Sequence, residues 1–106
     1  MSEIPEELRP IIERYPAFWS EAGHLFTQTL YEESKLDRKS IELILCALLA
    51  HLGWRTGLEV HARQAVLAGA SPDEVRGAVL LTFAVGATRS AAPALSWLEG
   101  VLDEAG

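Results

Sequence analysis

The segment from Ile41 to Ala50 is apolar at every position except Glu42. A helix that is apolar on all sides is buried on all sides, so we expect this segment to form the central helix of the fold. A chain of 106 residues still exposes much of its apolar surface when it folds alone. The pattern therefore predicts a central helix over residues 38–51, partly covered by another subunit.

The chain is expected to reverse direction at Leu52-Gly53, because glycine suits the left-handed residue just past a helix end. Glu42 lies ten residues before this bend, and His61 lies eight residues after it. At ~1.5 Å of rise per residue, the two side chains would lie at similar heights on antiparallel helices. Such helices pack ~8–10 Å apart, which two side chains can bridge directly or through a water. The spacing predicts an acid–imidazole pair, which is the basis of an acid–base site.

Each member of this pair also has a simpler interpretation. Glu42 could be a partly solvated acid near a helix N-terminus, where the dipole favours it. His61 could be a core histidine that binds a backbone carbonyl. The apolar neighbours of Glu42 favour burial, and a buried acid needs a partner. A straight helix through Gly53 would instead separate the two residues by roughly 28 Å and leave no site.

The rest of the sequence predicts an all-α protein with about six helices and no strand. Alanine and leucine dominate, and β-branched residues are few. Ser71 and Glu74 form a capping box around Pro72, which marks a helix start. Gly69 and residues 86–89 interrupt the helical pattern. The expected helices span residues 5–14, 16–33, 38–51, 54–67, 72–85 and 90–103, within a single domain over 1–106.

Charge and composition limit the partners and the location that we expect. The net charge of −6 makes nucleic acid and anionic membranes poor partners. The longest apolar run, 43–50, is far shorter than the roughly 20 residues of a membrane span, and the N-terminal segment does not resemble a signal peptide. Cys46 is the single cysteine and cannot form an internal disulfide. We therefore expect a cytoplasmic protein.

Several further residues are candidates for the site. A pocket beside the pair would be lined by Trp54, Gly57, Cys46 and Phe83, and a substrate carboxylate would be bound by Arg55 or Arg89. The simpler interpretations are an inert buried thiol for Cys46, a packing residue or subunit contact for Trp54, and a solvated surface side chain for Arg89. The three histidines lack the spacing of zinc ligands, so we expect no metal and no cofactor.

These residues resemble the carboxymuconolactone decarboxylase and alkylhydroperoxidase-D-like family. The similarity covers about half of the chain and lies in residues 36–44, 52–53, 61–62 and 68–75. It implies an all-helical fold of the alkylhydroperoxidase-D type, with small subunits assembled as homotrimers or homohexamers. It also implies sites near the subunit contacts, where Glu42 and His61 would relay protons.

The departures from the family pattern bear on function. In the peroxidase branch a Cys-x-x-Cys pair ends four residues before the histidine, and here Trp54 and Gly57 hold those two places. Neither residue forms a thiolate, so dithiol peroxide chemistry has lost its nucleophile. The decarboxylase branch typically has an acid where Gly57 stands. The chain thus matches the scaffold of both branches and the complete site of neither.

Three functions remain open. The first is a cofactor-independent acid–base enzyme, a decarboxylase, lyase or isomerase of a small carboxylate or lactone. In it His61 would act as the base or acid, and Glu42 would orient the His61 ring. The second is a non-catalytic oligomeric protein in which Glu42 and His61 are a structural pair. The third is a thiol peroxidase, which would require an exposed Cys46.

Overall fold

The computed structural model describes residues 4–105. Within them the regular secondary structure is all helical, with no strand, which confirms the predicted all-α class. Successive elements join end to end, so that they form six helical segments close to the expected ranges. The chain divides into two compact units, one ending at Asp37 and one beginning at Arg38. Every helix in the described residues is too short or too polar to cross a membrane.

The N-terminal unit consists of two helical segments. The first joins a short 3-10 helix, η1 (Glu6–Leu8), to α1 (Arg9–Arg14). Tyr15 then leaves the helical conformation at φ −130° and ψ 64°, because the ring of Pro16 disfavours it there. The second segment joins α2 (Pro16–Gly23), η2 (His24–Thr29) and α3 (Leu30–Ser34). The sequence does not predict that η2 is a π-helix, a wider turn inside a continuous helix.

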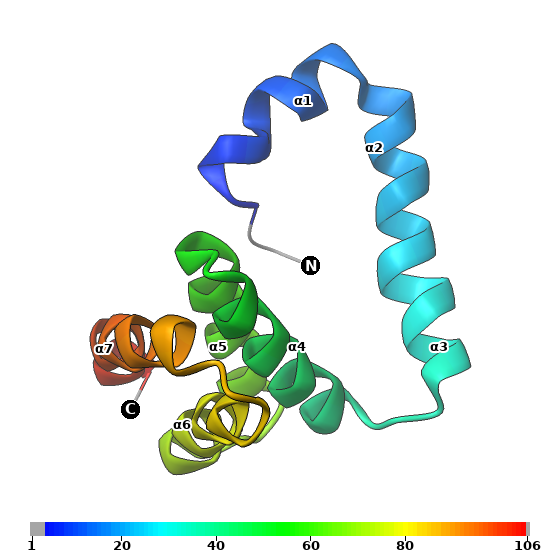
Figure 1. Ribbon diagram of the computed structural model, residues 1–106. Helices are drawn as coiled ribbons and strands as arrows, with labels where there is room; N and C mark the ends of the chain where they lie inside the picture. The colour runs from blue at the N-terminus through cyan, green and yellow to red at the C-terminus, as the bar shows by residue number, and fades with distance from the viewer. Residues whose placement is uncertain (1–3, 106) are drawn as a thin grey trace. The chain divides into compact units, whose positions relative to one another are not determined.

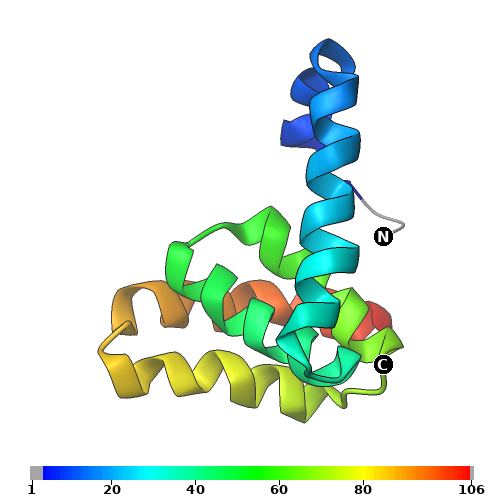
Figure 2. The same cartoon turned by 90° about the vertical axis from the view of Figure 1, so that its right-hand side faces the viewer.

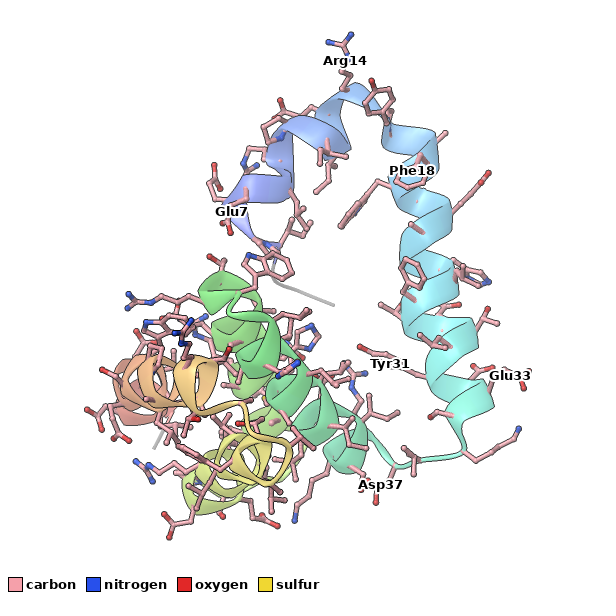
Figure 3. The ribbon with its side chains drawn as sticks, viewed as in Figure 1. Glu7, Arg14, Phe18, Tyr31, Glu33 and Asp37 are labelled. Carbon is pink, nitrogen blue, oxygen red and sulfur yellow. The ribbon has the colours of Figure 1, made fainter. Side chains whose placement is uncertain are left out.

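The second of these segments is amphipathic. Tyr31 and Glu33 point to opposite sides of it (Figure 3). Its apolar side chains form an exposed stripe, and none of its helices contains a buried residue. The large side chains of the stripe are between 51% and 63% exposed: Phe18, Leu25, Phe26 and Leu30.

The C-terminal unit contains the core. It consists of α4 (Arg38–Leu52), α5 (Arg55–Leu67), α6 (Pro72–Leu80), η3 (Leu81–Val85) and α7 (Thr88–Ala105). Helix α4 packs against α5, α6 and α7, and α7 also packs against α5 and α6 (Figures 1 and 2). The largest fully buried side chains come from all four α-helices: Cys46, Glu42, Leu58, Val75, Val79, Leu98 and Leu102.

The expected turns position these helices. Gly53 adopts φ +76° after α4, so the chain reverses there as predicted. Gly86 adopts φ +78° before α7. The capping box before α6 is complete, because the Ser71 hydroxyl accepts a bond from the Glu74 backbone and the Glu74 carboxylate accepts one from the Ser71 backbone. Helix α7 begins at Thr88, two residues earlier than expected, and contains Pro93 near its start.

Within the single chain the central helix is buried on one side, and cover of its other side by another subunit stays a prediction. Helix α4 is not buried on all sides: Ile44 is 47% exposed, Leu48 is 53% exposed and Leu52 is 73% exposed. These three positions are spaced four apart and therefore share one face, which we call the outer face of α4. The opposite, inner face carries Glu42, Cys46 and Ala50, all fully buried. Within the C-terminal unit the helix packs on the core through the inner face and through the flanking Leu43 and Leu49.

Candidate functional site

Glu42 and His61 meet in the structure. Glu42 lies in the second turn of α4 and His61 in the middle of α5, and the bend at Gly53 turns these helices back on one another. The Oε1 atom of Glu42 lies 2.6 Å from Nδ1 of His61. The Glu42 side chain has no exposed surface, whereas that of His61 is 18% exposed. The carboxylate is therefore sealed in the core, and the imidazole extends from it toward the surface.

Arg38 is a third member of the site that the sequence reasoning missed. Its Nε atom donates a hydrogen bond of 2.7 Å to Oε2 of Glu42. A signal for it exists in the sequence, since residues four apart on a helix lie side by side. The sequence pattern indicates His61, nineteen positions away, as the partner of Glu42, whereas Arg38 lies only four positions away. Both oxygens of the buried carboxylate thus have a nitrogen partner.

These contacts decide the charge of the Glu42 carboxyl. Burial by itself raises the pKa of this group, because the charged form loses its water. The hydrogen bonds from His61 and Arg38, with the positive charge that Arg38 carries and that His61 carries when it is protonated, outweigh that effect and leave the pKa of Glu42 below its usual value. The side chain is therefore an ionised carboxylate at neutral pH.

The ionised carboxylate also sets the tautomer of His61. A carboxylate accepts hydrogen bonds and has none to donate. Nδ1 of His61 must then carry the proton that bridges the 2.6 Å separation from Oε1 of Glu42. In the neutral ring this leaves the lone pair on Nε2, the nitrogen that faces away from the carboxylate. The arrangement gives His61 one nitrogen anchored in the core and one able to accept a proton.

Trp54 and Gly57 fit against each other. A Cβ atom placed on Gly57 would lie 2.5 Å from Cε3 of the Trp54 indole, a distance that no side chain tolerates. The indole therefore covers the face of α5 where any larger residue at position 57 would project. Trp54 is 36% exposed, and Gly57 is buried. The two substitutions seen in the sequence are structurally coupled, because the glycine makes room for the tryptophan.

The other two pocket candidates lie in different surroundings. Cys46 is fully buried in the hydrophobic core, one turn after Glu42 on the inner face of α4. Burial, and secondarily the nearby charge of Glu42, raises the pKa of its thiol to about 12. Phe83 lies in η3 and is 37% exposed. The structure therefore places Cys46 as a protonated core residue.

The arginine candidates are found on two helices. Nε of Arg55 lies 3.2 Å from Oε2 of Glu59, as expected for residues four apart, and its guanidinium carbon lies 5.9 Å from the ring centre of Trp97. Arg89 lies exposed in the first turn of α7. Neither belongs to the group of charged residues that contacts Glu42. In the part of the chain that the structure describes, no three histidine, cysteine or acidic side chains gather in a metal-binding cluster.

Comparison with known families gives a match over most of the chain. The model of the carboxymuconolactone decarboxylase family matches residues 17–100, a span that contains Arg38, Glu42, Trp54 and His61. Comparisons with curated proteins and with solved structures found no match. The family match covers well over half of the 106 residues. On this basis the chain belongs to the carboxymuconolactone decarboxylase family.

Proposed function

We propose that this protein is a cofactor-independent acid–base enzyme, a decarboxylase, lyase or isomerase that acts on a small carboxylate or lactone. The observation that carries the proposal is the fully buried, ionised Glu42 bonded to Nδ1 of a histidine that remains partly exposed. A purely structural pair has no need for an accessible imidazole. A catalytic histidine does, because its second nitrogen must reach the substrate.

In the proposed mechanism His61 moves the proton, and Glu42 holds the imidazole of His61 in place. Nε2 of His61 takes a proton from a carbon next to the substrate carbonyl, and the imidazolium that forms is stabilised by the Glu42 carboxylate 2.6 Å from Nδ1. Returning that proton to another carbon gives isomerisation. In a decarboxylation, loss of carbon dioxide leaves a carbanion or enolate, and a protonated His61 would donate the proton that completes the product.

Proton exchange tests this function without requiring that the substrate be known. The protein, treated with EDTA, would be incubated in D2O with a panel of β-keto acids and unsaturated carboxylated lactones, and deuterium uptake and loss of carbon dioxide would be followed by NMR. We expect exchange with the wild type and at least ~100-fold less exchange with His61→Asn. Loss of a general base can slow a reaction by more than this. His51→Asn is the matched control, since His51 is exposed on α4. Equal exchange in wild type and His61→Asn would reject the proposal.

One observation supports the second candidate, a non-catalytic member of the family. The Trp54 indole lies over Gly57, at the positions where the peroxidase branch carries its cysteines, and so fills space beside α5. Trp54→Ala distinguishes the candidates in the same exchange experiment. If the protein is catalytic, the variant should alter which members of the panel react. If neither the wild type nor this variant exchanges any of them, the non-catalytic candidate is favoured. The buried thiol of Cys46 gives no support to the peroxidase.

We also propose that copies of the chain associate, as a homotrimer or homohexamer in the cytoplasm. The support is the outer face of α4, where three large side chains at Ile44, Leu48 and Leu52 are about half exposed or more. Beside Ile44, α4 and α6 border an apolar groove of about 580 Å³ with small residues at Ala47, Gly77 and Ala78. A contiguous apolar surface of this kind is typical of a protein interface.

A further inference from the structure

We propose that Arg38 is a positioning residue that keeps His61 neutral, and therefore able to accept a proton, beside a buried carboxylate. The inference rests on the proposed role of His61 as the proton-transferring group. It starts from one structural fact: Glu42 has two oxygens, and Arg38 and His61 each bind one of them.

The geometry makes Arg38 a fixed partner of the carboxylate. Arg38 and Glu42 lie one turn apart on α4, and Nε of Arg38 is 2.7 Å from Oε2. Because the Glu42 side chain has no exposed surface, water does not screen the carboxylate from these two nitrogen partners. With Oε2 engaged by the arginine, rotation of the carboxylate is restricted and Oε1 stays aimed at Nδ1 of His61. In this proposal Arg38 acts through Glu42 and not by contact with the substrate.

The charge of Arg38 matters as much as its hydrogen bond. A buried carboxylate requires a positive counter-charge, and an arginine is always protonated. With Arg38 in place, the charge of Glu42 is balanced whether or not His61 carries a second proton. Without it, an imidazolium at His61 would be the counter-charge left in the contact, and protonation of the ring would be favoured. A histidine that holds two protons at neutral pH cannot act as a base.

Several other charged side chains on the helices of this unit are paired with one another. On α5 and α7, Arg63 binds Glu104, and on α6 and α7, Arg76 binds Glu99. Lys39, next to Arg38 on α4, lies 2.7 Å from Glu74 of α6. Cys46 is the other titratable group close to Glu42, and its thiol stays protonated. Arg38 is thus the cation whose removal would change the balance at Glu42.

The test measures the protonation of each histidine separately. Diethyl pyrocarbonate modifies neutral imidazoles, and peptide mass spectrometry resolves the rates at His24, His51 and His61 between pH 5 and 8. In Arg38→Met we expect the midpoint of the His61 profile to rise by about one pH unit, the scale of an adjacent charge. His24 and His51 are exposed and serve as references in the same sample. Lys39→Met is the matched control and should leave the His61 midpoint unchanged.

Two further variants separate charge from structure. Arg38→Lys restores the charge and should return the midpoint toward that of the wild type. Arg38→Gln keeps a hydrogen-bond donor without the charge and should behave like Arg38→Met, and it replaces that variant if Arg38→Met does not fold. The inference would be overturned if the His61 midpoint stays in place or falls in Arg38→Met, or in Arg38→Gln where that variant replaces it. The outcome is independent of turnover. If the wild type exchanges no substrate proton but Arg38→Met still shifts the His61 midpoint, the proposed enzyme is rejected and the role of Arg38 at His61 is not.

Discussion

The two faces of α4 invert the usual rule for which residues are buried. The inner face carries an ionised carboxylate, Glu42, with no exposed surface. The outer face carries Leu48 and Leu52, which are 53% and 73% exposed. Both faces belong to one helix of fifteen residues, so the difference does not arise from local helix formation.

What differs between the faces is the partner available to each. Helix α4 packs on α5, α6 and α7, and the one polar group of its inner face finds a nitrogen for each oxygen. A buried charge is tolerated when its hydrogen bonds are complete, and a leucine stays at the surface where its own unit does not pack on it. The comparison teaches that hydrophobicity identifies the residues that require cover, whereas the packing partner decides which of them obtain it.

The most severe change to this comparison is Glu42→Ala on the inner face. It leaves His61 and Arg38 without their acceptor in a space that a methyl group cannot fill, and breaking a buried ion pair costs about 3–5 kcal/mol. We expect the free energy of unfolding, measured by urea denaturation, to fall by about that amount. Glu99→Ala, which removes an exposed carboxylate bound to Arg76, should change the midpoint little. If the two variants are equally stable, Glu42 does not hold the inner face together.

On the outer face the corresponding change is Leu48→Glu. A charge at the centre of an interface must be desolvated when the copies associate, so we expect the dissociation constant of the assembly to rise at least ~100-fold, or about 2.7 kcal/mol. Analytical ultracentrifugation measures it. Leu67→Glu is the matched control, because Leu67 is 78% exposed on α5, beside Arg63 and Glu104. A wild type that is monomeric at high concentration would contradict the proposed interface.

The sequence predicts the inner face well, for physical reasons that can be named. A glycine after the apolar run predicts the reversal at Gly53, and the helical rise then sets Glu42 opposite His61. The capping box predicts the start of α6 in a similar way, because its hydrogen bonds join two residues at a fixed spacing along the chain. Features determined by local geometry and a count of residues are therefore recoverable from the sequence.

The sequence predicts the outer face poorly. A helix that is apolar on all sides contains no information about which side its own chain covers, so the exposure of Ile44 and Leu48 requires coordinates. The fit of Trp54 over Gly57 also depends on a side-chain conformation, which residue types and spacing do not determine. The partnership of Arg38 with Glu42 is an intermediate case, since its spacing of four is visible but is shared with many surface pairs that contribute little.

Acid should weaken the inner face before the outer one. The pKa of Glu42 is lower in the folded protein than its ordinary value, so its ionised form stabilises the fold above about pH 4.5, and this contribution is lost as the pH falls through the folded pKa. The effect should be smaller than that of Glu42→Ala, because protonation preserves the shape of the side chain. We expect the unfolding free energy of the wild type to fall more steeply below that pH than that of Glu42→Gln.

The difference between these two acid profiles isolates Glu42. Exposed carboxyls with lowered pKa values include those of Glu6, Glu74 and Glu99, but these groups are present in both proteins. Their contributions therefore cancel when one profile is subtracted from the other. Parallel profiles would show that the charge of Glu42 does not stabilise the inner face.

The mildest probe of the inner face is the reactivity of Cys46, which needs no substitution. Burial, together with the charge of Glu42, raises the pKa of this thiol to about 12, so at pH 8 the reactive thiolate should be about 1,000-fold scarcer than for an ordinary cysteine. We expect native protein to resist iodoacetamide and urea-unfolded protein to react fully, with the modified fraction read by mass spectrometry. Any slow labelling of the native state then reports how often α4 lifts from α5, because a fully buried sulfur reacts only through such opening. If association through the outer face also holds α4 in place, dilution of the protein should raise the labelling rate. A labelling rate that does not depend on concentration would show that the inner face is stable without a partner on the outer face.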